Sequence, residues 1–449
     1  MKKFNREKAL RKIEVQRKWQ KYSRYVYIAI PCILCGILGL YLAYSKFFVT
    51  QENDVVQTKV GDFVYGDVII NNYVNGQYTV EAPAQATGYK VDKIVCDNGA
   101  VGEWDARNYG PIISNVTRRS KCNIYFVDAE MVNIGHVTVP LDDYGLCPTI
   151  NADGTVTVTE VESQYGYLCK AKDAYGDSYY YRGNVINNYV KFAGFYWRII
   201  RINGDGTVRV IYDGTSAHAN SDASTDRQIG TTAFNSSYND NAYVGYMYGK
   251  TGASTYAETH TNTNNSTIKT YLDTWYENNI KGTMNEQYIA DNIFCNDRSF
   301  ASNNSGTGVG TSRTYYRCYN FANNSNNIKA MLACPQKNDA FTVNDTSKGN
   351  GALTYGVGLV TIDEVVLAGG LSSNINYYLY LGQYYRTMSP SYFDDDVSHA
   401  SGCIVGSNGF VHCSNSVNDS GGVRPVFNLK SEVLLQGTGT ASDPYHLAS

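Results

Sequence analysis

Three consecutive aspartates, Asp394–Asp396, stand in the run FDDDVSH. Clustered carboxylates are suitable ligands for a hard cation such as Ca²⁺, and His399 with Ser398 and Ser401 raises the question of a Ser–His–Asp set. However, the run lacks the alternating spacing of a known calcium loop, and no G-x-S-x-G turn surrounds either serine. We therefore expect a polar acidic loop without catalytic residues and without a cofactor, and we keep calcium as an alternative.

Tyrosine is the second residue type that could form a functional site, since 40 of the 449 residues are Tyr. The ring combines a rigid apolar body with a polar tip, which suits recognition of carbohydrate or protein. The clusters are DSYYYR at 177–182, TYYRCYN at 314–320 and NYYLYLGQYYR at 376–386. The alternative is that these rings pack in a β core. Our candidate binding residues are Tyr384, Tyr385, Arg386, Tyr392, Asp394, Asp395 and Asp396.

The cysteines indicate the compartment of the protein. Eleven are present, nine of them after residue 45; these nine form no CxxC pair and the six His are scattered, so we expect no metal site. In an exported chain disulfides are the better interpretation. Proximity in the sequence suggests Cys96–Cys122, Cys147–Cys169 and Cys403–Cys413. Of the remaining three we choose Cys295–Cys334, which leaves Cys318 unpaired.

The N-terminal segments differ in composition from the rest of the chain. Residues 1–24 contain ten basic and two acidic side chains, so the remainder of this chain of net charge −3 carries −11. Such an acidic body argues against nucleic acid as a partner. Residues 25–45 are uncharged and at about 1.5 Å per residue would span a bilayer core of roughly 30 Å. We expect a transmembrane helix there, although a signal peptide cleaved near Ser45 is an alternative.

This charge pattern also predicts an orientation. Positive charges remain on the cytoplasmic side of a membrane. We therefore expect a single-pass plasma-membrane protein with a cytoplasmic N-terminus and an extracellular body, attached to the membrane through residues 25–45. Residues 46–60 are expected to form a stalk.

Turn signals divide the remaining chain. Residues 61–128 are expected to be a small antiparallel, immunoglobulin-like β module, because Asn75-Gly76 lies between alternating runs. Residues 129–170 read as a connector whose hairpin turns at Asp153-Gly154. From 171 to 449 we expect a large, irregular α+β domain.

Two helices are predicted in the large domain. Residues 266–280 begin with an N-capping Ser266 and place Ile268, Tyr271, Leu272 and Trp275 on one face. Residues 361–370 begin with the capping box Thr361–Glu364 and end at Gly369-Gly370.

Residues 145–449 contain an ordered series of motifs that resembles a known family. The motifs include GNVINNYVKFAGFYWRIIRINGDGTVRVIYDG, STIKTYLDTWY, LTYGVGLVTIDEVVLAGG, YYRTMSPSYF and GVRPVFNLKSEV. They resemble domains of surface and membrane-anchored proteins of Gram-positive bacteria. That family is similar to the C-type-lectin-like fold of formylglycine-generating, sulfatase-modifying enzymes. The resemblance implies two helices, a twisted antiparallel sheet and long loops.

The resemblance also guides the interpretation of particular residues. Formylglycine-generating enzymes use a cysteine pair with copper, whereas Cys403 and Cys413 flank a predicted hairpin and are expected to form a structural disulfide. Arg386 stands where the family usually has Trp. In the closing GVRPVF motif, Arg424 should pair with an acidic group or with loop carbonyls, and Pro425 should lie at an irregular or edge position. We assign structural roles to Arg424, Pro425, Trp197, Thr361 and Glu364.

The functional expectation follows from these features. We expect a non-enzymatic, membrane-anchored extracellular protein whose C-terminal domain binds an envelope, host or glycan ligand. The alternatives are an enzyme related to formylglycine generation and a structural scaffold of an envelope complex.

Overall fold

The computed structural model describes most of the chain after residue 67 and little before it. The described residues are 11–12, 14–21, 68–83, 88–105, 109–117, 119–129, 131–134, 137–140, 147–158, 166–302, 306–321, 328–371, 374–434 and 436–447. The predicted membrane helix (25–45), the predicted stalk (46–60), most of the basic segment (1–24) and residues 61–67 lie outside this set.

Two predictions from the sequence are corrected by the described residues. None of the helices in these residues combines the length and the apolar character needed to cross a membrane. This finding contradicts the prediction of a single-pass plasma-membrane protein. The α+β class is also wrong, because strands make up 36% of the described residues and helices 16%, so the fold is mostly β with several sheets.

The helical share is small because most helical segments are single turns. After residue 67 the described α-helices are α2 (Tyr256–Thr259), α3 (Thr267–Asn279) and α4 (Ile362–Leu367). The described 3₁₀ turns are Thr225–Arg227, Asn241–Val244, Glu286–Tyr288, Arg317–Phe321, Lys337–Asp339 and Ser431–Leu434. Abundant Gly, Asn, Thr, Val and Tyr favour strands and turns over longer helices.

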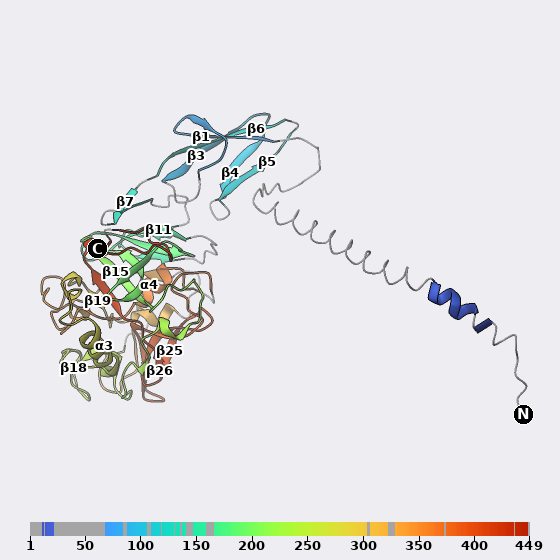
Figure 1. Cartoon of the computed structure of the whole chain (residues 1–449). Helices are drawn as coiled ribbons and strands as arrows, with labels where there is room; N and C mark the ends of the chain where they lie inside the picture. The colour runs from blue at the N-terminus through green and yellow to red at the C-terminus, as the bar shows by residue number, and fades with distance from the viewer. Residues whose placement is uncertain are drawn as a thin grey trace, which may run out of the picture.

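Strands β1 to β6 form the small module (Figure 1). They are β1 (Ile69–Val74), β2 (Gln77–Thr79), β3 (Tyr89–Cys96), β4 (Val101–Asp105), β5 (Gly110–Ser114) and β6 (Lys121–Asp128). The predicted turn at Asn75-Gly76 joins β1 to β2, with φ of 48° and 82°. The four-stranded sheet has the order β2-β1-β6-β3, and β4 pairs with β5.

The prediction of an antiparallel module is wrong for one strand pair. β1 and β6 run parallel in the centre of the sheet, so the sheet is mixed. The chain makes the β1–β2 hairpin, then the edge strand β3 and the β4–β5 hairpin, before β6 enters beside β1 in the same direction. Turn signals identify hairpins, but they do not say which distant strand fills the centre of a sheet.

Short strands follow the module. β7 (Met131–Ile134) pairs with β8 (Val137–Pro140), and β9 (Thr149–Ile150) pairs with β10 (Val156–Val158). The β9–β10 hairpin contains the predicted Asp153-Gly154 turn, where Gly154 has φ of 82°. A distant strand, β21 (Ile328–Ala330), adds to β10.

The first large sheet contains three strands from the GNVINNYVKFAGFYWRIIRINGDGTVRVIYDG motif at 183–214. Its order is β11-β12-β14-β15-β27, and β13 pairs with β14. The strands are β11 (Gly166–Lys172), β12 (Asp177–Gly183), β13 (Tyr189–Phe192), β14 (Phe195–Ile202), β15 (Val208–Gly214) and β27 (Val426–Leu429). Trp197 on β14 is fully buried, and its ring stacks on Phe427 of β27 with centroids 4.8 Å apart. This pair links the first strands of the large unit to the last.

The second large sheet carries most of the residues proposed from the sequence. Its order is β16-β26-β23-β24-β25, and β20 pairs with β23. The strands are β16 (Thr231–Ala233), β20 (Thr314–Tyr315), β23 (Tyr385–Asp394), β24 (His399–Val405), β25 (Val411–Ser416) and β26 (Ser420–Gly422). Two further pairs are β17 (Met247–Tyr248) with β18 (Asn264–Asn265), and β19 (Phe294–Cys295) with β22 (Ala340–Phe341).

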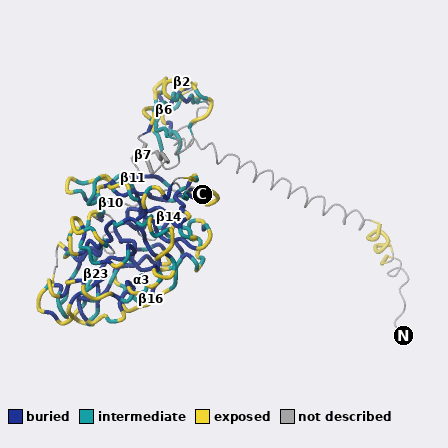
Figure 2. The backbone as a smooth tube through the Cα atoms, turned by 60° about the vertical axis from the view of Figure 1, so that its left-hand side comes forward, coloured by how far each residue is buried: buried dark blue, intermediate teal, exposed yellow. Residues whose placement is uncertain are grey.

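Burial and cross-links are concentrated in the large unit. Figure 2 shows buried backbone throughout its centre, whereas the small module is mostly intermediate or exposed. The structure contains the four expected disulfides, Cys96–Cys122, Cys147–Cys169, Cys295–Cys334 and Cys403–Cys413, and Cys318 is a buried free thiol. Four disulfides are consistent with an extracellular protein.

Candidate functional site

The binding residues proposed from the sequence lie at opposite ends of β23. This strand has ten residues, so its ends are roughly 30 Å apart. Tyr384, Tyr385 and Arg386 lie at its start, and Tyr392 with Asp394–Asp396 lies at its end. The two groups therefore do not form one site.

The residues at the start of β23 are mainly structural. Tyr385 is fully buried and donates a hydrogen bond to the Leu379 carbonyl at 3.0 Å. Arg386 is 1% exposed, and burial lowers its pKa to about 10. Its guanidinium donates to the Ser416 carbonyl at 2.8 Å. Only Tyr384 is exposed, and its hydroxyl donates to the Ser420 carbonyl at 2.7 Å.

The three aspartates at the end of β23 are already paired with a cationic side chain. The carboxylates of Asp394, Asp395 and Asp396 approach one another within 4.8 Å. Arg313 forms ion pairs with all three, and its guanidinium nitrogen is 3.3 Å from Asp394 Oδ1. Tyr392 packs beside them against Tyr319, with ring centroids 5.5 Å apart. This arrangement is a surface ion cluster, in which an arginine occupies the place of a metal ion.

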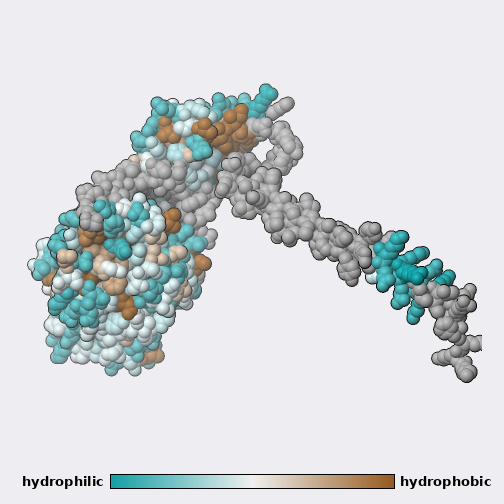
Figure 3. Space-filling view, viewed as in Figure 1, coloured by the Kyte–Doolittle hydropathy of each residue, from teal (hydrophilic) through white to brown (hydrophobic). Residues whose placement is uncertain are grey.

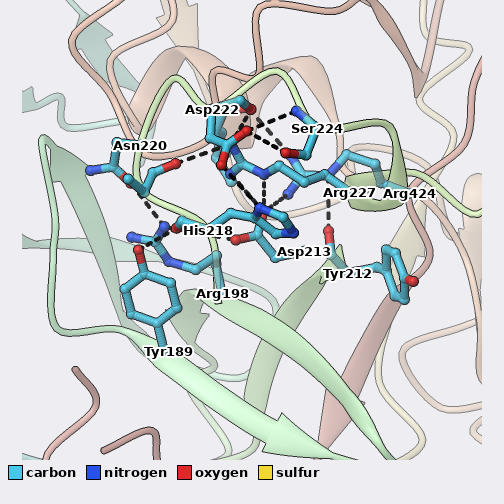
Figure 4. A network of polar contacts seen from close by, with 12 residues as sticks. Tyr189, Arg198, Tyr212, Asp213, His218, Asn220, Asp222, Ser224, Arg227 and Arg424 are labelled. Atoms are coloured by element: carbon cyan, nitrogen blue, oxygen red, sulfur yellow. Dashed lines mark hydrogen bonds and ion pairs between the residues drawn. The ribbon is translucent and has the colours of Figure 1, made fainter. Parts of the chain in front are cut away.

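Arg424 belongs to a buried polar network at the end of β15 (Figure 4). It donates to the Tyr212 carbonyl at 2.9 Å, to the Leu379 carbonyl at 3.3 Å and to Asp213 at 2.8 Å. Pro425 follows between β26 and β27, and its carbonyl accepts the Tyr212 amide at 2.9 Å. All polar contacts of Arg424 are therefore within the protein.

Asp213 is the shared carboxylate of this network. Arg227 donates to it at 2.7 Å, and an Arg198 nitrogen lies 3.9 Å away. Three guanidiniums thus surround one carboxylate, and all four side chains are fully buried. At its outer edge His218 lies between Asp222 at 3.1 Å and Asp226 at 3.0 Å. The hydrogen bonds from Ser224 and His218 lower the pKa of Asp222 to about 2.

Glu364 forms a second buried ion network. Its carboxylate accepts the Thr361 amide at 3.0 Å, which completes the capping box of α4. It also pairs with Arg201 at 3.0 Å and with Arg209 at 2.5 Å. An adjoining polar cavity of about 20 Å³ is large enough for about one water molecule. This size excludes an organic ligand, and the groups around it are already ion-paired.

An open groove lies beside α3, with a volume of about 620 Å³. We call it the α3 groove. Its twelve lining residues come from α3, β16, β17, β18 and the segments that follow β16 and precede α3. Three are aromatic: Tyr248, Tyr271 and Trp275. Three are amides: Asn235, Asn265 and Asn278. Six are hydroxyl residues: Thr232, Ser236, Ser266, Thr267, Thr270 and Thr274.

The aromatic rings of the α3 groove are held by their neighbours. Trp275 packs against Phe195 and Tyr212, with ring centroids 5.5 and 6.0 Å apart, yet remains half-buried. The Tyr271 hydroxyl donates to the Ile229 carbonyl at 3.2 Å. Tyr248 packs edge-on against Tyr243 at 5.4 Å, and burial raises its pKa, so its hydroxyl stays protonated at neutral pH.

The polar groups of the α3 groove are uncharged and several lack partners. Within the described part of the chain, the side chains of Thr232, Ser236, Asn265 and Asn278 make no hydrogen bond, nor does the indole N–H of Trp275. These groups supply both donors and acceptors to a ligand. No Asp, Glu, His, Lys or Arg side chain lines the groove.

A smaller groove of about 470 Å³ has a different character. It lies between the β13–β14 hairpin and residues 442–447, and its lining includes Lys191, Asp443 and His446. Asp443 accepts the Thr438 amide at 3.0 Å, and Lys191 lies over the Tyr196 ring at 5.8 Å. Its charged groups already have partners within the chain.

Two residues of the α3 groove are candidates from the sequence, but the sequence predicts them on a buried helix face and not in a groove. Tyr271 and Trp275 were predicted on the apolar face of a helix at 266–280 together with Ile268 and Leu272. In α3, Ile268, Leu272 and Tyr276 are buried, whereas Tyr271 and Trp275 lie at the border of that face. Thr270, Thr274 and Asn278, at intervals of four beside these rings, are the signal that an aromatic stripe meets a polar surface. The opposite wall comes from distant segments and has no local signal.

Comparison with known proteins adds no relative. No protein-family model, no curated protein and no solved structure matches the chain.

Proposed function

We propose that the protein binds carbohydrate in the α3 groove. The observation that carries the proposal is the composition of this groove: three aromatic rings lie among neutral hydroxyl and amide groups, and no charged side chain lines it. Sugars present apolar C–H faces, which pack on aromatic rings, and many hydroxyl groups, which need paired donors and acceptors. The α3 groove offers both kinds of contact in one hollow of about 620 Å³.

The arrangement of the rings supports binding over a purely structural role. Trp275 and Tyr271 are fixed by internal contacts, so a ligand would order few side chains on binding. The disulfides are consistent with an extracellular setting, where glycans are available. We do not propose the formylglycine-generating alternative, because the cysteine pair on which it depends, Cys403–Cys413, is a buried disulfide.

The test is a glycan array probed with the intact chain, followed by calorimetric titration of each glycan that binds. Thr274 is exposed on α3, and its hydroxyl donates to the Thr270 carbonyl at 2.9 Å. Thr274→Lys places a long charged chain over the α3 groove while keeping a good helix former, and should weaken binding about tenfold or more.

The matched control is Thr283→Lys in the turn after α3. Thr283 is also exposed, and its hydroxyl also donates to a backbone carbonyl, that of Ile280 at 2.7 Å, but it does not line the α3 groove. Both variants should keep the melting temperature of the parent chain. Equal glycan affinity of the two variants would refute a site in the α3 groove, and no binding to any glycan would refute the function.

A further inference from the structure

The three aromatic residues of the α3 groove follow one another along α3. Tyr271 and Trp275 are four residues apart, so they lie one above the other on the same face of the helix. Tyr248 pairs with Asn264 across β17 and β18, and Asn264 lies two residues before the helix cap Ser266. Tyr248 therefore stands at the N-terminal end of α3, and the order along the groove is Tyr248, Tyr271, Trp275.

The lining residues of the α3 groove that belong to α3 follow the same direction. On α3 the lining extends from Thr267 to Asn278, which at 1.5 Å per residue is a length of about 16 Å. One turn of the helix, about 5.4 Å, is close to the length of one pyranose unit in an extended chain. The groove is thus about three sugar units long, and it has three rings in sequence to support them.

The lining also restricts the charge of the ligand. None of the twelve lining residues carries a charge. A carboxylate or sulfate group brought into the groove would lose hydration without gaining a cation, and this loss disfavours binding. Lys269 is the basic residue of α3, but it is 1% exposed and pairs with Asp273 at 2.6 Å, so it is not available to an anionic sugar.

We infer that the α3 groove takes an uncharged linear oligosaccharide of three units lying along α3, with one unit at each of Tyr248, Tyr271 and Trp275. This inference rests on the proposed function and specifies its ligand. The unit at Tyr248 is the outermost at the N-terminal end of the helix. Removing this ring shortens the groove by one unit and leaves the other two subsites intact.

The experiment measures affinity of the intact chain against ligand length. Cello-, chito- and β-1,4-manno-oligosaccharides of one to six units are titrated by calorimetry, together with oligogalacturonates and their neutral methyl esters. Affinity should rise by about tenfold or more from one unit to three and stay level beyond three. Oligogalacturonates should bind more weakly than their methyl esters.

Variants at Tyr248 test whether the third sugar unit binds at this ring. Tyr248→Ala should leave the affinity for a disaccharide within about twofold of the parent and remove the gain from the third unit. Tyr248→Phe keeps the ring and should keep that gain. Tyr384→Ala, at an exposed tyrosine outside the α3 groove, controls for loss of an aromatic side chain. The melting temperature of each variant shows that the chain is folded.

The outcomes separate the inference from the proposed function. Affinity that does not depend on length, a rise that continues beyond three units, or equal affinity for oligogalacturonates and their methyl esters would each overturn the inference while leaving carbohydrate binding in place. An unchanged length profile in Tyr248→Ala would overturn the assignment of the third unit. If none of these oligosaccharides binds while a glycan on the array does, the inference is wrong and the proposed function stands; if no glycan binds in either experiment, both proposals are wrong.

Discussion

At the scale of single residues, buried charge determines much of this structure. Arg424 is fully buried, and burial lowers its pKa. Its planar guanidinium donates hydrogen bonds to two backbone carbonyls and to Asp213 at once, and it lies over the Tyr385 ring at 5.1 Å. A buried cation is tolerated only when such partners replace its hydration. The Arg-Pro pair near the end of the chain therefore serves to hold β27 against β15.

Arg424→Lys should destabilise the protein by about 2 kcal/mol, because an ammonium group has no planar fork and leaves a buried carbonyl without a donor. Chemical denaturation of the two chains measures this difference. Glycan binding in the α3 groove should be unchanged, since Arg424 does not line it. Loss of binding at unchanged stability would show instead that Arg424 belongs to a binding site.

His260 provides a second prediction for a single residue. Burial and the nearby Arg298 lower its pKa to about 3, and its Nδ1 lies 2.8 Å from the Tyr256 carbonyl. The folded state therefore keeps His260 neutral, whereas the unfolded state binds a proton near pH 6.5. Above pH 6.5 the neutral His260 does not reduce the free energy of unfolding. As the pH is lowered from 6.5 to 3, the free energy of unfolding falls by about 1.4 kcal/mol per pH unit, because the unfolded state binds a proton that the folded state does not.

Denaturation midpoints from pH 7 to pH 4 test this prediction. His260→Asn keeps a donor for the Tyr256 carbonyl but removes the titrating ring, so its stability should depend less on pH in this range. Parallel pH profiles for the two chains would contradict a buried neutral histidine.

At the scale of elements, long loops are fastened by cross-links and by short strand pairs. The segment from 281 to 360 contains β19, β20, β21 and β22, each of only two or three residues. Cys295 at the end of β19 is bonded to Cys334, 39 residues later. Such a bridge acts mainly by reducing the freedom of the unfolded chain.

The double variant Cys295→Ala with Cys334→Ala should lose about 4 kcal/mol of stability, as expected for a loop of this length. Urea denaturation under non-reducing conditions measures the loss. Cys318→Ala is the matched control, because it removes a buried thiol and leaves all four bridges. A loss no larger than that of the control would show that the region is held by its other contacts.

At the scale of the whole molecule, burial is divided between two cores. The large cluster is built from residues after 155, whereas a small one contains Ala100, Ile113 and Cys122 of the module. Trp104 is the module residue that packs against the large cluster. Figure 3 shows apolar residues scattered over the large unit and a more continuous apolar patch on the module. The exposed apolar residues of the module include Ile69, Val80 and Val95.

We expect residues 147–449 to fold without the module, since the large cluster and three of the four disulfides lie within this segment. Its thermal unfolding should occur within a few degrees of the main transition of the intact chain, followed by near-ultraviolet circular dichroism. Absence of a cooperative transition in this fragment would mean that the module stabilises the large unit.

The sequence alone determined the features that depend on neighbouring residues. Ser266 and the Thr361–Glu364 box begin helices, and Asn75-Gly76 and Asp153-Gly154 make turns, because each acts through contacts a few residues away. The cysteine pairs are 10 to 39 residues apart, and proximity in the sequence suggested three of the four. The β-rich composition was also visible, although the two predicted helices led us to a wrong α+β class. Their contribution is small because α4 has six residues and α3 thirteen.

Only the tertiary structure decided which distant residues meet. It placed β6 parallel to β1, gave Asp213 to three arginines, and put the candidate residues of β23 at two separate ends. It also formed the α3 groove, whose walls come from residues 232–236, Tyr248 and α3. Sheet order and burial depend on contacts between segments far apart in the chain, and local sequence patterns do not predict those contacts.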